Sequence, residues 1–107
     1  MHDYTACIEA CNDCADACDR CAAACLSEGS ASEMASCIAL DIDCAAICRL
    51  GASMMSRSSE LSHECCELCA KACDACAAEC ERHEAAHCQQ CAQACRACAE
   101  ECRSMTR

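Results

Sequence analysis

The sequence predicts an all-α protein, an up-down-up-down antiparallel four-helix bundle with a cysteine-lined interior. Its 107 residues include 20 cysteines, and most of them recur at alternating steps of three and four residues. A helix with that spacing places its thiols on one face, at the positions that meet partner helices in a bundle. The chain also has 24 alanines and no proline, so helix propensity is high along nearly its whole length. Short turns between segments of about 20 residues make consecutive helices antiparallel neighbours.

The first helix is expected over residues 5–26, where the cysteine pattern is unbroken. Its thiols are Cys7, Cys11, Cys14, Cys18, Cys21 and Cys25. The opposite face carries polar and charged residues such as Asp13, Asp16 and Arg20, as expected for a face exposed to water.

The second helix is expected over residues 31–55 and has the poorest row of thiols. Its inward positions are Met34, Cys37, Asp41, Cys44, Cys48, Gly51 and Met55. A second apolar stripe, formed by Leu40, Ile47, Leu50 and Met54, lies beside that row. A helix that is apolar nearly all round is usually buried all round, so we expect this one to pack against its copy in another subunit.

The third and fourth helices are expected over residues 60–82 and 87–104, which completes one domain over residues 1–107. The third contains Cys65, Cys66, Cys69, Cys73, Cys76 and Cys80, and either or both of the adjacent pair can face inward. The fourth contains Cys88, Cys91, Cys95, Cys98 and Cys102. Two histidines, His83 and His87, flank the turn between these helices.

Disulfide bonds are a poor explanation for these cysteines. Side chains three or four residues apart on a helix hold their Cβ atoms ~5–6 Å apart, whereas a disulfide needs ~3.8 Å. No basic region followed by an apolar run marks a signal peptide at the start of the sequence. We therefore expect reduced thiols and a cytoplasmic protein.

Metal binding explains the cysteines better. A core of cysteine and alanine would be thin or hollow without further atoms, because protein interiors are close-packed. Thiolates select soft ions such as Cu(I), Zn(II) and iron–sulfur clusters. Continuous thiol rows match neither an isolated zinc tetrahedron nor the compact runs that hold iron–sulfur clusters. They favour Cu(I), with the twenty cysteines, His83 and His87 as candidate ligands, and leave Asp41 hydrogen-bonded, protonated or touching metal.

Charge and motifs restrict the other function classes. The formal net charge of −10 excludes a nucleic-acid-binding surface, and no apolar run is long enough to cross a membrane. No catalytic triad, carboxylate pair or phosphate-binding loop is visible, so we expect a binding protein and not an enzyme. The rival hypotheses are a zinc or general soft-metal buffer of metallothionein type and a thiol redox enzyme that uses an activated cysteine.

Two stretches resemble a known family. The run from Tyr4 through Cys7 to Cys25 looks like the first helix of the bacterial copper storage proteins, and the run from His83 through His87 to Cys102 is similar to their last helix. The resemblance covers the whole chain and is greatest for the cytosolic branch. It implies a four-helix bundle, storage of many Cu(I) ions by thiolates, and a homotetramer. The partners it suggests are copper ions and the chaperone or efflux proteins that exchange them.

The two ends of the predicted bundle differ in chemistry. His83 and His87 gather at one end, and Met55 and Met105 at the other. We interpret the methionines as apolar plugs. Because imidazole binds Cu(I) less tightly than thiolate does, we expect the histidine end to be the mouth through which copper passes inward.

Overall fold

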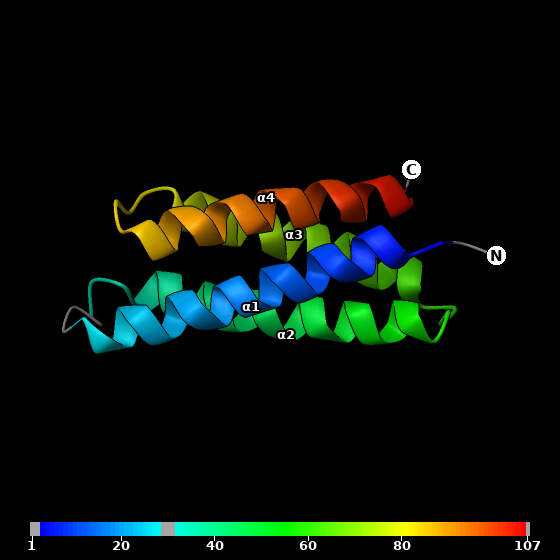
Figure 1. The fold of residues 1–107 in the computed structure, drawn as a ribbon, viewed down its shortest axis with the longest axis horizontal. Coiled ribbons are helices and arrows are strands. Elements are labelled where there is room, and N and C mark those ends of the chain that lie inside the picture. Colours follow the sequence, from blue (N-terminus) through cyan, green and yellow to red (C-terminus); the bar gives the residue numbers. More distant parts are fainter. Residues whose placement is uncertain (1–2, 29–31, 107) are drawn as a thin grey trace.

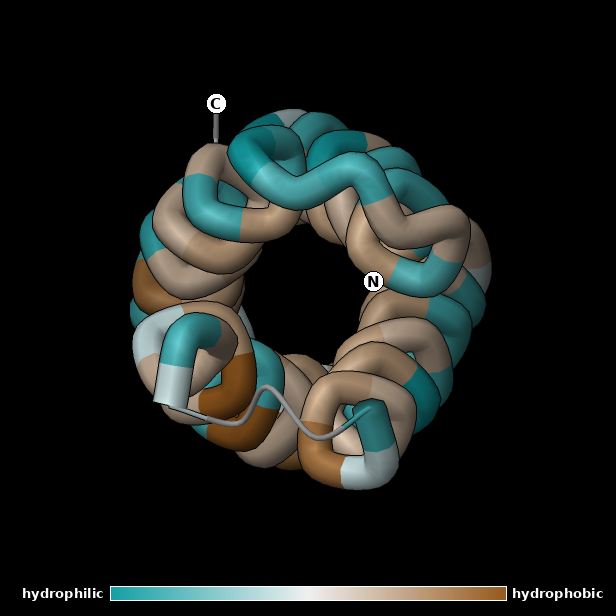
Figure 2. Tube along the Cα trace, turned by 90° about the vertical axis from the view of Figure 1, so that its left-hand side faces the viewer, coloured by the Kyte–Doolittle hydropathy of each residue, from teal (hydrophilic) through white to brown (hydrophobic). Residues whose placement is uncertain are grey.

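The computed structural model describes residues 3–28 and 32–106 and confirms the four-helix bundle (Figure 1). The helices are α1 (Thr5–Ser27), α2 (Ala35–Ser56), α3 (Ser62–Cys80) and α4 (Ala86–Thr106). They run up, down, up and down along a rod whose Cα extents are 47 × 19 × 17 Å. Figure 2, which looks along the rod, shows the helices as a ring in which each packs against two neighbours, in the order α1, α2, α3, α4.

Helix boundaries are where the sequence-based expectations fail. α2 begins at Ala35 and not near residue 31; residue 31 itself lies outside the described residues, and residues 32–34 form a turn. α3 is two residues shorter than expected at each end, whereas α4 extends to Thr106. The error arises because Ala, Glu, Met and Ser are all compatible with helix. Propensity alone therefore cannot show where the chain must leave one helix to reach the next.

The turn between α2 and α3 is closed by a Schellman motif. Ser58 has a positive φ of 53°, a conformation for which glycine is the usual residue. The Ser59 amide donates to the Met54 carbonyl at 2.9 Å, and the Ser58 amide donates to the Met55 carbonyl at 3.0 Å. These bonds satisfy carbonyls at the end of α2 and fix the direction in which α3 begins.

Arginines join the helices of each hairpin on the outer surface. Arg49 on α2 reaches Asp16 and Asp19 on α1 at 3.0 and 2.7 Å. On the other hairpin, Arg96 and Arg103 of α4 both pair with Asp74 of α3, at 3.3 and 2.8 Å. Within residues 3–28 and 32–106, no arginine or lysine forms an ion pair across the α1–α4 seam.

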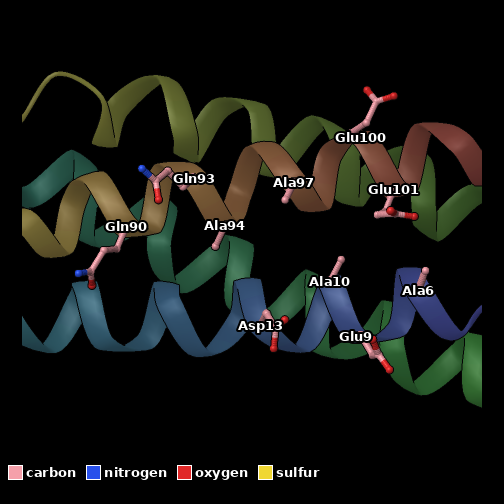
Figure 3. Close-up of a pocket in the computed structure, with 10 residues that line it drawn as sticks. All are labelled: Ala6, Glu9, Ala10, Asp13, Gln90, Gln93, Ala94, Ala97, Glu100 and Glu101. Atoms are coloured by element: carbon pink, nitrogen blue, oxygen red, sulfur yellow. The ribbon is translucent and has the colours of Figure 1, made fainter.

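A shallow groove lies outside the bundle at that α1–α4 seam (Figure 3). Small residues, including Ala10 and Ala97, line its floor, and carboxylates of Glu9, Asp13 and Glu101 line its edges. No cysteine lines the groove, so it is separate from the interior.

The interior consists of thiols and small side chains. Every cysteine is buried, and alanines such as Ala15, Ala77 and Ala99 fill the spaces between helices. Within the described residues, none of the helices combines the length and apolar character needed to cross a membrane.

Candidate metal centre

Most of the twenty thiols touch another thiol in a column along the bundle axis. All are free and buried. Neighbouring sulfurs lie 3.4 to 4.0 Å apart, with Cys48 and Cys69 the shortest described pair. Cys14 alone touches all three other helices, at 3.8 Å from Cys44, 3.8 Å from Cys73 and 3.6 Å from Cys95.

The expectation of a thin or hollow core is wrong. Cys14 on α1 and Cys73 on α3 meet across the diagonal at 3.8 Å, and Cys48 on α2 meets Cys98 on α4 at 3.9 Å. Because cysteine and alanine are small, the helices approach until the thiols touch. Metal ions must therefore take the place of thiol protons between sulfurs and do not fill an empty channel.

The sulfur spacing suits ions shared among several thiolates. With metal–sulfur bonds of ~2.3 Å, a trigonal ion separates its sulfurs by ~4.0 Å and a tetrahedral ion by ~3.8 Å. The observed spacing is within a few tenths of an ångström of both values. Small side-chain movements are therefore enough to seat an ion.

Cysteines are shared between neighbouring groups of potential ligands. The ligand atoms of each group lie within 4.8 Å of one another. The groups include Cys11, Cys69, Cys98 and Cys102; Cys14, Cys44, Cys48 and Cys73; Cys14, Cys18, Cys44 and Cys95; Cys18, Cys76, Cys91 and Cys95; and Cys21, Cys25, His87 and Cys88. Sharing of Cys14, Cys18, Cys44 and Cys95 means that a thiolate can bridge two ions, as in a cluster.

The two histidines have different surroundings. The Nδ1 atom of His87 lies 3.3 Å from the Cys21 sulfur and 3.6 Å from the Cys88 sulfur, so this ring joins the thiol column. The Nε2 atom of His83 lies 2.8 Å from a carboxylate oxygen of Glu79, on the outer part of the same end. The structure therefore brings His87 to the predicted ligands and places His83 beside a carboxylate.

Comparison with known proteins identifies the family. The sequence profile of the copper storage proteins matches residues 1–107. The chain belongs to the copper storage protein family. No curated protein matches the chain.

Solved structures of this family are similar over almost the whole chain. The Cu(I)-bound copper storage protein BsCsp3 is 48% identical, with a TM-score of 0.94 over 97% of this chain and 98% of that one. The metal-free copper storage protein 3 from Bacillus subtilis is 47% identical, with a TM-score of 0.91 over 98% and 100% of the two chains. A cytosolic copper storage protein from Streptomyces lividans, solved with five coppers, is 40% identical, with a TM-score of 0.92 over 95% of this chain and 90% of that one.

Asp41 is the fully buried carboxylate in this copper storage protein core. Its Oδ1 atom accepts hydrogen bonds from the thiols of Cys76 at 3.2 Å, Cys91 at 3.3 Å and Cys80 at 3.7 Å. The expectation that it is hydrogen-bonded is confirmed. Burial, followed by the nearby Cys91, raises the pKa of Asp41 to about 7.

The metal-free protein should lose stability through Asp41 as the pH rises. The folded-state pKa of about 7 exceeds the ordinary value of 3.8, so between these values the native state binds more protons than the unfolded state. The free energy of unfolding then decreases with rising pH, by about 4 kcal/mol across the window. Asp41→Asn keeps the shape and removes the titration. Thermal melts at pH 5 and pH 7.5 should show a larger decrease in melting temperature for the wild type than for the variant. Equal decreases would refute this role of Asp41.

Burial keeps several thiols of the empty protein protonated at neutral pH. Burial raises the pKa of Cys25 and Cys65, and burial with the nearby Asp41 carboxylate raises the pKa of Cys37 to about 12. Each ion must therefore displace protons from the thiols that bind it.

Some features of the site were not visible as a sequence pattern. Glu28, just after α1, holds Nε2 of His87 at 2.9 Å and thereby turns Nδ1 toward the thiols. Both Cys65 and Cys66 face inward, at 8% and 1% exposure. Cys65 packs beside Gly51, where an added Cβ atom would make an ordinary contact with its sulfur at 3.6 Å. Heptad position could indicate Gly51 as a gap, but no local pattern indicates the contact with Glu28, which is distant in sequence.

Proposed function

We propose that this chain stores Cu(I) in the cytosol as clusters of shared thiolates inside a bundle formed by residues 1–107. The observation that carries the proposal is the column of buried thiols: all twenty cysteines are free and buried, and most have a neighbouring sulfur at 3.4 to 4.0 Å. Relatives support it, because BsCsp3 is solved with Cu(I) and the Streptomyces lividans protein is a cytosolic copper storage protein solved with copper. Thiolates are soft ligands, and sulfurs spaced for three- or four-coordinate binding suit Cu(I).

The arrangement favours storage over the rival functions. A structural zinc site uses four ligands of its own in a closed tetrahedron, whereas Cys14 and Cys18 here each belong to two groups, which argues against isolated zinc sites. A zinc buffer with bridging thiolates is disfavoured instead by the relatives that are solved with copper. A thiol redox enzyme needs a reactive cysteine within reach of its substrate, whereas every cysteine of this chain is buried. We therefore propose a binding role and no catalytic one.

Anaerobic titration with Cu(I), followed by metal analysis of the gel-filtered protein, tests this function. We expect on the order of 15–20 ions per chain, since bridging thiolates allow nearly one ion per thiol. Zn(II) should bind in smaller number, because each closed site consumes four ligands. Saturation at four Cu(I) ions or fewer would reject storage in favour of discrete sites.

We further propose that His87 marks the mouth of the column. It lies at the end of the thiol row, its Nε2 is held by Glu28, and its Nδ1 faces Cys21 and Cys88. An ion bound first by this imidazole can pass to the thiolates, which hold it more tightly. Copper chaperone or efflux proteins would exchange ions at this end.

The outer face of α2 supports a homotetramer as the assembled form. Leu40, Ile47 and Met54 are half-buried, but Ile42 and Leu50 are 56% and 52% exposed. These two side chains lie on either side of the exposed Ala46. This face, which has small Ala46 at its centre and few charges, allows close approach of a second helix.

Leu50→Glu should therefore dissociate the assembly. A buried charge without a partner is strongly unfavourable at an interface, so sedimentation should give a smaller particle. Leu26→Glu is the matched control, because Leu26 on α1 is 59% exposed but lies outside the α2 face. A wild type that already sediments as a monomer would disprove the tetramer.

A further inference from the structure

The end of the column opposite His87 contains a sulfur that is not a cysteine. Met55 faces inward from α2 and is 2% exposed. Its Sδ atom accepts a hydrogen bond from the Cys66 thiol at 3.6 Å. An apolar plug needs only bulk at this position, but here the thioether sulfur itself faces the thiols.

Three thiols complete a layer around this sulfur. The thiol of Cys66 on α3 lies close enough to Cys102 on α4 and Cys7 on α1 for both to shift its pKa. The sulfurs of Cys7 and Cys102 lie 3.7 Å apart. Together with Met55, they form a layer that takes one sulfur from each of the four helices, and every member is buried.

Ser62 adds a second, independent sign of an incomplete site. Its side chain is 1% exposed, and its Oγ is a buried side-chain oxygen with no hydrogen-bond partner in the described part of the chain. It precedes Cys66 by one helical turn and therefore lies on the same face of α3. A neutral thiol is a weak acceptor, whereas a thiolate accepts a charge-assisted hydrogen bond. A thiolate at Cys66 would therefore be a better partner for this hydroxyl than the neutral thiol is.

We propose that Cys7, Met55, Cys66 and Cys102 bind one Cu(I) ion, the terminal ion of the store. Binding forms copper–sulfur bonds and breaks S–H bonds: each ligating thiol releases its proton to solvent, Met55 donates a lone pair without losing a proton, and copper stays Cu(I). Ser62 then donates to the Cys66 thiolate. This inference rests on the proposed storage of Cu(I).

The thioether gives this ion its own properties. Thioethers are ligands for Cu(I) but are not among the residues that bind Zn(II) in proteins, so the layer discriminates between the two ions. A neutral sulfur also attracts a cation less strongly than a thiolate does. The terminal ion is therefore the most weakly bound ion of the store.

Anaerobic Cu(I) titration against a competing chelator tests the assignment with Met55→Leu, a substitution that nearly conserves volume. We expect about a tenfold weaker affinity for the last ion and unchanged affinities for the earlier ones, as for the loss of a supporting ligand. Met34→Leu is the matched control, because Met34 is also buried at a bundle end but has no described sulfur contact with a thiol. Ser62→Ala should weaken the same last ion without lowering the melting temperature of the metal-free protein.

Crystals of the loaded wild type provide a second measurement that does not depend on folding of a variant. The expected result is an anomalous copper peak within bonding distance of Met55 Sδ. If the wild type holds many ions but no copper lies there and Met55→Leu binds every ion normally, Met55 is a plug and the assignment is overturned while storage stands. If the wild type itself saturates at four ions or fewer, the storage function fails instead.

Discussion

Copper loading is expected to raise the melting temperature of this protein by at least about 30 °C. The metal-free bundle is held by small side chains, because its column consists of cysteine and alanine and its largest aliphatic residues, such as Leu50 and Leu68, are half exposed. Each ion present at a hundredfold excess over its dissociation constant adds about 2.7 kcal/mol, and 1 kcal/mol shifts the melting temperature of such a domain by about 4–8 °C. Three tightly bound ions, which add about 8 kcal/mol, therefore suffice for this rise.

Circular dichroism melts of the empty and loaded protein under anaerobic conditions measure this effect. Removal of copper by a chelator should restore the lower melting temperature, which separates metal binding from irreversible oxidation. The unfolded chain also offers thiols, but the shared ligand groups from four helices exist only in the native state. Equal melting temperatures with and without copper would mean that the ions do not bind the folded column.

Replacement of His87 by alanine is expected to slow Cu(I) uptake about tenfold while leaving the final capacity nearly unchanged. The ring contacts Cys21 and Cys88 through Nδ1, so its removal takes away a ligand at the mouth but none of the thiols behind it. Stopped-flow transfer from a coloured chelator gives the rate, and metal analysis of the product gives the capacity.

Two control variants separate the mouth from the general effect of losing a histidine. His83→Ala should slow uptake much less, because His83 lies against Glu79. Glu28→Gln should have an intermediate effect, since the amide still reaches Nε2 but no longer fixes which nitrogen carries the proton. Normal uptake by His87→Ala, with slow uptake by Met105→Leu, would place the mouth at the opposite end.

Heptad spacing was sufficient to predict which side of each helix faces inward. Cys7 to Cys25 on α1 and Cys88 to Cys102 on α4 occupy the predicted row, because the side-chain direction on a helix depends only on residue number. Composition then indicated soft-metal chemistry. Neither argument depends on how one helix is placed against another.

Contacts between helices were beyond the reach of the sequence. The pairing of Glu28 with His87 and of Met55 with Cys66 depends on the axial offset between helices, which no periodicity encodes. The same limit explains the wrong expectation of a hollow interior. Interhelical distance is set by side-chain size, so a column of thiols draws the helices together until sulfurs such as those of Cys48 and Cys69 touch.

The arginine ion pairs are distributed unevenly around the bundle. Arg49 links α1 to α2, and Arg96 and Arg103 link α4 to α3, so these pairs lie within the two hairpins. The two hairpins are joined by the capped turn at Ser58, whereas carboxylates line both edges of the α1–α4 seam. Repulsion between these carboxylates opposes close contact of α1 and α4, so we expect separation of helices to require the least free energy at this seam. If loading needs more room than small side-chain movements give, we expect the bundle to widen at the α1–α4 seam, on the side opposite the α2–α3 turn.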